Sequence, residues 1–283
     1  MSKQSFHQKL DRQLLILEEM EQLLILVTQI RQDHPRMSSR QMYRLIRPAY
    51  LGRDRFEAFC FENGFKVTVK RSFHRTTNSL GVTRFENLIA GLELTGINQV
   101  WASDITYYRI ADTFYFLTFI LDLYSRMIVG YSVSTNLSTH ATTIPALKMA
   151  LGRRRITRGQ IFHSDGGGQY YCKEWLQLTA QYAMKNSMCD TPYENPHAER
   201  INGIIKNDYL FGYGPENYEE LCSMTLKAVT KYNLEKPHGA LGNISPVQFE
   251  NHLCDKRGNV DDLKTSNPHS SRHNNNRDLK MYI

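Results

Sequence analysis

The sequence has few cysteines, no long apolar run and no leader-like N-terminus. Its five cysteines stand singly, without a Cys-x-x-Cys pair, which argues against a disulfide framework or a zinc knuckle and suits a reducing compartment. No apolar run approaches membrane-spanning length, and the opening residues, Met-Ser-Lys-Gln-Ser-Phe-His, lack an apolar region and a small-residue cleavage site. These absences predict a soluble cytoplasmic protein without a membrane partner.

The charge of the chain is concentrated in one segment. The 283 residues are 41% hydrophobic and 22% charged, which allows one sizeable core and a smaller domain. A net charge of +7 indicates a polyanionic partner but does not distinguish DNA, RNA and an acidic membrane. Between Arg31 and Arg75, eleven basic residues face four acidic ones, an excess equal to that of the whole chain. The remainder is nearly neutral.

The basic segment has the pattern of a small helical domain. Residues 8–32 carry leucines at helical spacing, which predicts a helix that packs on its own domain or serves in dimerisation. Two short basic helices, 40–47 and 53–61, then flank a turn that contains Gly52. This is typical of a helix-turn-helix whose second helix enters a DNA groove. The alternative is an ordinary helical hairpin with a solvated basic face.

These patterns divide the chain into four parts. We expect an N-terminal helix at 1–32, a helix-turn-helix domain with a basic extended linker at 33–80, a core with C-terminal helices at 95–250, and a polar, disordered tail at 251–283. The basic side chains expected to contact DNA in the second part are Arg40, Arg44, Arg47, Arg53, Arg55, Lys70 and Arg71.

The core has the pattern of a mixed α/β sheet. Three consecutive strand-like runs, at 100–110, 113–123 and 127–133, are joined by short turns, which predicts an antiparallel meander. Expected helices at 139–152 and 173–184 then alternate with expected strands at 160–164 and 186–189, and this alternation implies parallel crossovers. Asn195-Pro196 marks the start of a helix to about residue 210, and a further helix is expected at 218–232. The result is a mixed sheet flanked by helices.

Three acidic residues stand where they could share a site. Asp104 interrupts an apolar strand, where an unpaired charge is costly. Asp165 ends the run 160–165, and Glu199 lies early in the expected helix. A first and a fourth strand often pair at the sheet centre, which would place Asp104 and Asp165 on neighbouring strands. Singly, each acid has an ordinary alternative: a satisfied structural acid, a turn and a solvated helix residue.

Together, the three carboxylates predict a divalent-metal site. Magnesium prefers carboxylate oxygens, and two such ions can clamp an in-line displacement at phosphorus. Asn202 and Lys206 follow Glu199 by three and seven residues, so they share its helix face and could reach a bound DNA backbone.

Two nearby residues compete for a place in this site. Asp122 is a fourth acid, but a pair with Arg126 or a turn hydrogen bond explains it at least as well. His163, beside Asp165, is expected to be packed rather than to bind metal.

At this point the chain resembles a known family over most of its length. It is similar to the catalytic subunit of bacterial insertion-sequence transposases, whose core is retroviral-integrase-like and of the Asp-Asp-Glu class. The motifs that carry the resemblance are Asn98-Gln-Val-Trp-Ala-Ser-Asp104-Ile-Thr-Tyr, Asp122-Leu-Tyr-Ser-Arg-Met-Ile-Val-Gly-Tyr131, His163-Ser-Asp165-Gly-Gly-Gly-Gln-Tyr170, Glu199-Arg-Ile-Asn-Gly-Ile-Ile-Lys206, and Tyr232-Asn-Leu-Glu-Lys-Pro-His-Gly-Ala-Leu241 followed by Ser245-Pro246.

The resemblance implies a fold, a reaction and partners. It implies a ribonuclease-H-like α/β fold preceded by a small helix-turn-helix domain, and catalysis by Asp104, Asp165 and Glu199 with magnesium, or manganese in its place. The implied reaction is DNA strand cleavage followed by transfer of a 3′-hydroxyl into target DNA. The implied partners are DNA, further copies of the chain in a homo-oligomer, and a companion protein that recognises the element ends, in the nucleoid-associated bacterial cytoplasm.

Two features depart from the family pattern, and two other functions stay open. Asp165 and Glu199 are 34 positions apart, slightly fewer than is usual, and an unfamiliar lead into the helix makes Glu194 a minor rival to Glu199. A ribonuclease-H-like nuclease or resolvase would hydrolyse DNA without joining it. A non-catalytic DNA-binding derivative would tolerate loss of Asp104.

Overall fold

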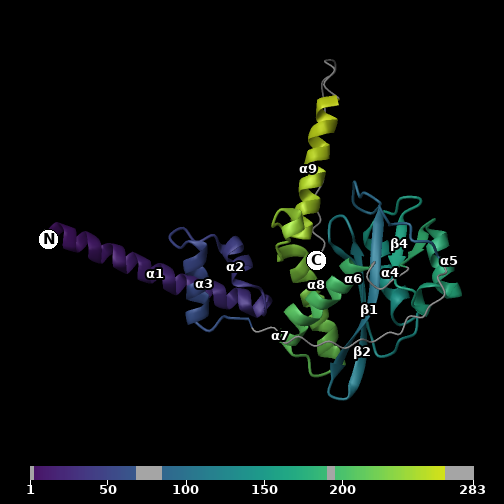
Figure 1. Ribbon diagram of the computed structural model, residues 1–283, viewed down its shortest axis with the longest axis horizontal. Coiled ribbons are helices and arrows are strands. Elements are labelled where there is room, and N and C mark those ends of the chain that lie inside the picture. Colours follow the sequence, from purple (N-terminus) through teal and green to yellow (C-terminus); the bar gives the residue numbers. More distant parts are fainter. Residues whose placement is uncertain (1–2, 68–84, 190–194, 265–283) are drawn as a thin grey trace, which may run out of the picture.

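The computed structural model describes residues 3–67, 85–189 and 195–264 (Figure 1). The basic linker with Lys70 and Arg71, the rival acid Glu194 and the tail 265–283 lie outside the described residues.

The N-terminal part is a helical unit of three helices: α1 (Lys3–Asp33), α2 (Ser39–Ile46) and α3 (Arg53–Glu62). Its core is formed by residues of the second half of α1, of the turn that follows it and of the two short helices: Leu23, Val27, Met37, Met42, Phe56, Phe59 and Cys60. Ser38 and Gln41 form a capping box at the start of α2. The three helices expected at 8–32, 40–47 and 53–61 are thus present, each within a few residues of the expected bounds.

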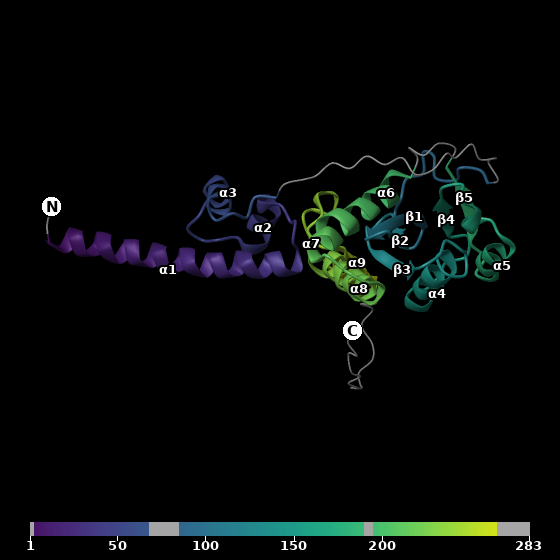
Figure 2. The same ribbon diagram turned by 90° about the horizontal axis from the view of Figure 1, so that it is seen from below.

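The first half of α1 leaves its apolar side chains uncovered. Figures 1 and 2 show α1 extending well beyond α2 and α3. The exposed apolar residues of α1 are Leu10, Leu14, Leu15, Ile16, Leu17, Leu24, Ile25 and Leu26. The helical unit therefore buries one side of the later part of α1, at Leu23 and Val27, while Leu24, Ile25 and Leu26 stay exposed.

The core contains a five-stranded mixed sheet in the order β3-β2-β1-β4-β5. Its strands are β1 (Val100–Ile110), β2 (Thr113–Asp122), β3 (Ile128–Ser134), β4 (Ile161–Ser164) and β5 (Lys185–Met188). The first three strands pair antiparallel, whereas β4 is parallel to both β1 and β5. The predicted meander and the predicted parallel crossovers are both confirmed, and β1 lies at the centre.

Helices cover both faces of this sheet (Figure 2). One face packs against α4 (Thr143–Arg153) and α5 (Lys173–Gln181) around Trp101, Phe162 and Trp175. The other packs against α6 (Pro196–Gly203), the π-helix η3 (Ile204–Leu210), α7 (Phe211–Tyr213) and α8 (Tyr218–Glu235). Two short 3₁₀ turns are η1 (Gly168–Tyr170) and η4 (Gly239–Leu241). The expected α/β sheet flanked by helices is confirmed.

Two helices differ from their expected courses. The single helix expected to run to about residue 210 changes at Ile204 into the π-helix η3, whose hydrogen bonds span five residues. Polar composition predicted a disordered tail from residue 251, but α9 (Pro246–Lys264) continues through residues 251–264, and that part of the prediction is wrong. Ser245 and Gln248 cap the start of α9 reciprocally, so a helix already nucleated extends through polar residues.

The helical unit contacts the core through the end of α1. His34 is buried, with Nδ1 at 3.0 Å from the Tyr209 hydroxyl and Nε2 at 3.0 Å from a Glu235 carboxylate oxygen. The Tyr213 hydroxyl donates to the Asp33 carbonyl at 2.6 Å. These contacts join the helical unit to η3, α7 and α8. Within the described part of the chain, none of the helices has the length and apolarity that crossing a membrane would require.

Candidate active site

Asp104 lies in the middle of the central strand. It pairs in register with Phe119 of β2, and its neighbour Ser103 pairs with Ser164 of β4. Asp165 directly follows Ser164, so the parallel pairing of β1 with β4 brings the two aspartates to adjacent strands. The sequence predicted this juxtaposition.

Asp165 begins a tight glycine turn. Its carboxylate accepts from the Gly167 N–H at 3.3 Å, and its carbonyl accepts from the same N–H at 2.6 Å. An added Cβ at Gly167 would lie 3.1 Å from the Asp165 carboxylate. The small residue therefore keeps the space beside this acid open.

Glu199 comes to the same edge of the sheet on α6. The start of α6 is anchored because the Asn195 amide donates to the Ser103 carbonyl at 2.9 Å. Glu199 is in the first turn of α6 and is exposed. One turn further on, Asn202 donates from Nδ2 to the Asp104 carboxylate at 2.7 Å. The helix thus crosses β1 beside Asp104.

The three acids influence one another electrostatically. The pKa of Asp104 is raised to about 7, mainly by burial and in addition by the negative charges of Asp165 and Glu199. Hydrogen bonds from the Ile105 N–H and from Asn202 oppose this shift. Burial also raises the pKa of Asp165. Near neutral pH, the Asp104 carboxyl group can therefore release its proton when a cation binds beside it.

The acids do not form a closed metal cage in this conformation. Among the described residues, no group of three or more histidine, cysteine, aspartate or glutamate side chains is gathered closely enough to hold a metal ion. Glu199 extends into solvent, as expected where like charges repel one another.

Asn202 and Lys206 both contact β1, whereas Glu199 on the same helix is exposed. Lys206 Nζ donates to the Thr106 hydroxyl at 2.8 Å and to the Tyr107 carbonyl at 3.2 Å. Burial lowers the pKa of Lys206, and the nearby charge of Asp104 raises it. Asn202 Oδ1 is buried without a hydrogen-bond partner among the described residues. Both side chains are thus engaged with the strand that carries Asp104.

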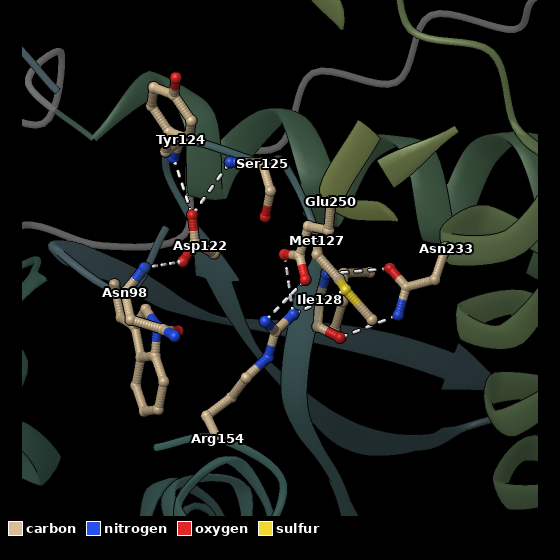
Figure 3. Close-up of polar contacts among 10 residues, drawn as sticks. Asn98, Asp122, Tyr124, Ser125, Met127, Ile128, Arg154, Asn233 and Glu250 are labelled. Atoms are coloured by element: carbon tan, nitrogen blue, oxygen red, sulfur yellow. Dashed lines mark hydrogen bonds and ion pairs between the residues drawn. The ribbon is translucent and has the colours of Figure 1, made fainter. Parts of the chain in front are cut away.

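Asp122 is a structural acid. Its buried carboxylate accepts three backbone N–H bonds, from Asn98 at 2.6 Å, Tyr124 at 2.9 Å and Ser125 at 3.0 Å (Figure 3). The turn hydrogen bond weighed from the sequence is therefore present. His163 is fully buried, with Nδ1 2.9 Å from the Ser187 hydroxyl, and this confirms the prediction that it is packed.

Two residues that sequence reasoning missed support the aspartates. Tyr170 is buried with its hydroxyl 2.9 Å from the Ser103 hydroxyl. Burial raises the pKa of Tyr170, and the charges of Asp165 and Asp104 raise it further, so the phenol lies close to both acids and stays protonated. Asn195 was read only as a helix cap, but its amide reaches the carbonyl next to Asp104. No local sequence signal reveals either role.

The predicted DNA contacts of the helical unit lie on its surface. Arg40 pairs with Glu57 at 2.9 Å, and Arg53 pairs with Asp54 at 2.8 Å. Arg44 donates to the Asn243 side-chain oxygen at 2.6 Å. Arg47 is the left-handed C-cap of α2, and Arg55 projects from the first turn of α3. All five guanidinium groups are exposed.

The central antiparallel meander, its parallel extension and the acidic edge define a ribonuclease-H-like domain. Integrase core domain models match residues 95–193 and 181–246. The chain is 34% identical over 204 residues to the insertion element IS600 uncharacterized 31 kDa protein of Shigella sonnei, covering 70% of this chain and 75% of that protein. It is 31% identical over 193 residues to transposase InsF for insertion sequence IS3A of Escherichia coli strain K12, covering 66% and 67%.

Among solved structures, it is similar to the HTLV-2 integrase catalytic core domain in complex with magnesium, with 23% identity, a TM-score of 0.44, and 54% of this chain and 94% of that chain covered. The relatives show that the chain belongs to the family of bacterial insertion-sequence transposases with an integrase core domain. DNA transposition is the function that this membership assigns.

Proposed function

We propose that the chain cleaves DNA strands and transfers a 3′-hydroxyl into target DNA in a divalent-metal-dependent reaction, with Asp104, Asp165 and Glu199 as its catalytic acids. The observation that carries the proposal is the pKa of Asp104, raised to about 7 by burial and by two neighbouring carboxylates. Three acids at one edge of a sheet are costly for stability alone, and a bound cation removes that cost.

The donor set fits a hard divalent cation. Asp104 and Asp165 offer carboxylate oxygens on adjacent strands, Glu199 offers a third, and the buried Asn202 Oδ1 is an unpartnered oxygen beside them. Magnesium, or manganese, would supply Lewis-acid activation of the phosphodiester and of the attacking hydroxyl when bound. Oxygen ligands without histidine or cysteine favour these metals over zinc.

The residues around the acids hold them in place. Asn202 fixes the orientation of the Asp104 carboxylate through its 2.7 Å hydrogen bond. Lys206 adds a positive charge near Asp104 while its ammonium stays on β1, and it stands ready to contact a phosphate when DNA approaches. Tyr170 excludes water below the two aspartates because its ring is buried there. These groups preorganise the site before DNA binds.

DNA binding is proposed for the helical unit within residues 33–80. Arg53 and Arg55 in the first turn of α3, with Arg40, Arg44 and Arg47 on α2, give one exposed surface five guanidinium groups. Phosphate contacts of this kind give affinity that falls with salt. We propose that Lys70 and Arg71 also contact DNA. They belong to the linker that precedes the catalytic core at 95–250 and lie outside the described residues.

We also propose that the chain self-associates. Active transposition would use a homo-oligomer that holds both element ends, and the exposed leucines of α1 offer an apolar surface for self-association. We further propose that a companion protein recognises the element ends. The location that we propose is the bacterial cytoplasm, in association with the nucleoid.

The experiment compares single substitutions in the three acids with an exposed control. Asp104→Asn, Asp165→Asn and Glu199→Gln should each abolish Mg²⁺-dependent cleavage of a duplex carrying the element end, while DNA affinity in Ca²⁺ stays within about twofold. Asp112→Asn, on an exposed β1–β2 turn, should leave both unchanged. Full cleavage by any of the three variants would remove that acid from the site. A pre-cleaved 3′ end that is never joined to target DNA would instead favour a hydrolytic nuclease.

A further inference from the structure

A group of basic side chains lies on the side of the sheet that α6 and α8 cover, and one member is next to Glu199 in the chain. Arg126 is in the turn between β2 and β3, His197 and Arg200 are on α6, and His238 follows α8. Burial lowers the pKa of Arg126 and of both histidines. The charges of Arg126 and Arg200 lower the pKa of both histidines further, and that of Arg200 also lowers the pKa of Arg126, so the four groups lie within electrostatic reach of one another. We call these four residues the cationic cluster.

The cluster has no anionic partner within the described part of the chain. Arg126 Nη1 is buried without a hydrogen-bond partner, and so is His238 Nε2. Neither Arg126 nor Arg200 forms an ion pair with a described carboxylate. Asp122 interacts weakly with Arg126, but its oxygens already accept three backbone N–H bonds.

Other buried cations of the core are paired. Arg154 lies 2.7 Å from Glu250, as Figure 3 shows, and Lys236 lies 2.9 Å from Asp208. Each of these contacts satisfies a charge that has been taken out of water. Arg126 is half-buried and its buried Nη1 has no hydrogen-bond partner, whereas Arg154 and Lys236 are each paired with a carboxylate.

The cluster is held in place by Tyr232. Its buried hydroxyl donates to the Arg126 carbonyl at 2.9 Å, and its ring meets the His238 ring edge-on at 5.0 Å. The Arg126 N–H donates to the Asp122 carbonyl at 2.9 Å, and Arg126 has a φ of 62°. The backbone of the turn is therefore fixed before any ligand arrives.

We propose that the cationic cluster binds a phosphate group of the DNA strand held at the acidic site, with Arg126 and Arg200 as its principal ligands. This inference rests on the proposed function. Arg200 and His197 lie within one helical turn of Glu199 on α6, so this part of the cluster is close to the acid at which we place the DNA strand. Guanidinium groups match phosphate oxygens through paired N–H bonds, and a phosphate supplies the negative charge that the half-buried Arg126 lacks.

The test measures how DNA affinity depends on salt. Binding of a mixed-sequence duplex in Ca²⁺ is followed from 50 to 300 mM NaCl for the wild-type chain, Arg126→Gln and Arg200→Gln. Each variant should bind about tenfold more weakly at the lowest salt, and the slope of log affinity against log salt should fall by about 0.9, the value for one lost phosphate contact. The double variant should lose little more slope than either single variant, because both side chains hold one phosphate.

Matched controls make the result specific. Arg153→Gln removes the same charge from the exposed end of α4, on the opposite sheet face, and should leave the slope unchanged. Arg200→Lys should restore most of the slope. Unchanged slopes in Arg126→Gln and Arg200→Gln, or an equal loss in Arg153→Gln, would overturn the proposal. If Arg126→Gln fails to fold, the salt slope of Arg200→Gln, at an exposed residue, is the deciding measurement.

The outcome is distinguishable from a failure of the catalytic proposal. Asp104→Asn lies outside the cluster and should keep the wild-type salt slope while losing cleavage. A wild-type slope in Arg126→Gln together with inactive Asp104→Asn would reject the phosphate site alone. Active Asp104→Asn would reject the acid site, whatever the slopes show.

Discussion

Replacing Asp104 by asparagine should stabilise the metal-free protein at alkaline pH. In the folded chain the pKa of Asp104 is about 7, against an ordinary value of 3.8. The fold therefore binds a proton that the unfolded chain releases between these two values. Stability contributed by this proton is complete below pH 3.8 and is lost progressively as the pH rises to about 7.

The magnitude follows from the two pKa values. Each tenfold difference in proton affinity is worth about 1.4 kcal/mol, so ionising Asp104 in the folded state costs about 4 kcal/mol. Asparagine carries no charge at any pH, and its side-chain oxygen can still accept from Asn202. We expect Asp104→Asn to gain up to about 4 kcal/mol over the wild-type chain at pH 8, and little at pH 4.5.

The assay is urea unfolding at pH 4.5 and pH 8 in EDTA, repeated at pH 8 with Mg²⁺. Asp112→Asn serves as the control, because the Asp112 side chain is 98% exposed. Mg²⁺ should stabilise the wild-type chain more than Asp104→Asn, since it favours the ionised site. The reasoning is refuted if the two chains have the same stability at pH 8, because Asp104 would then ionise without the cost that its burial implies.

Three other substitutions test contacts in the core, at the junction with the helical unit and beside the acids. Gly130→Ala should destabilise the chain by about 3 kcal/mol in urea unfolding, because its Cβ would lie 2.2 Å from the Ala146 carbonyl of α4; wild-type stability would show that α4 can shift. Burial lowers the pKa of His34, so its neutral form stabilises the chain above pH 6.5, and this contribution is lost as the pH falls through its lowered pKa. The difference in unfolding free energy between wild type and His34→Gln should shrink between pH 7.5 and 5, and a constant difference would contradict this. Lys206→Gln should cost about 1 to 2 kcal/mol in the same assay, from lost hydrogen bonds to β1, and no loss would show that the ammonium is not held there.

Much of the core could be predicted because its signals are local. The bounds expected for β1, residues 100–110, agree with Val100–Ile110, and the first three strands pair as the short turns required. Alternation of helix and strand also predicted the parallel pairing of β4 with β1. That pairing put Asp165 beside Asp104 before any coordinates were considered.

The two departures have different causes. The change to a π-helix at Ile204 occurs where the chain packs against β1 and α8, and no propensity marks it. The helix through residues 251–264 continues from a local cap formed by Ser245 and Gln248, which the composition of the later residues does not reveal.

The sequence by itself determined the order of strands and helices, the choice of the three candidate acids and the basic character of the helical unit, because periodicity and turn residues act over a few neighbouring positions. Only the tertiary structure decided that Asp104 is desolvated beside Asp165, that Lys206 rests on β1 and that the buried Arg126 Nη1 lacks a hydrogen-bond partner among the described residues. Desolvation and charge pairing depend on which distant residues the fold brings into contact, and no local pattern contains that information.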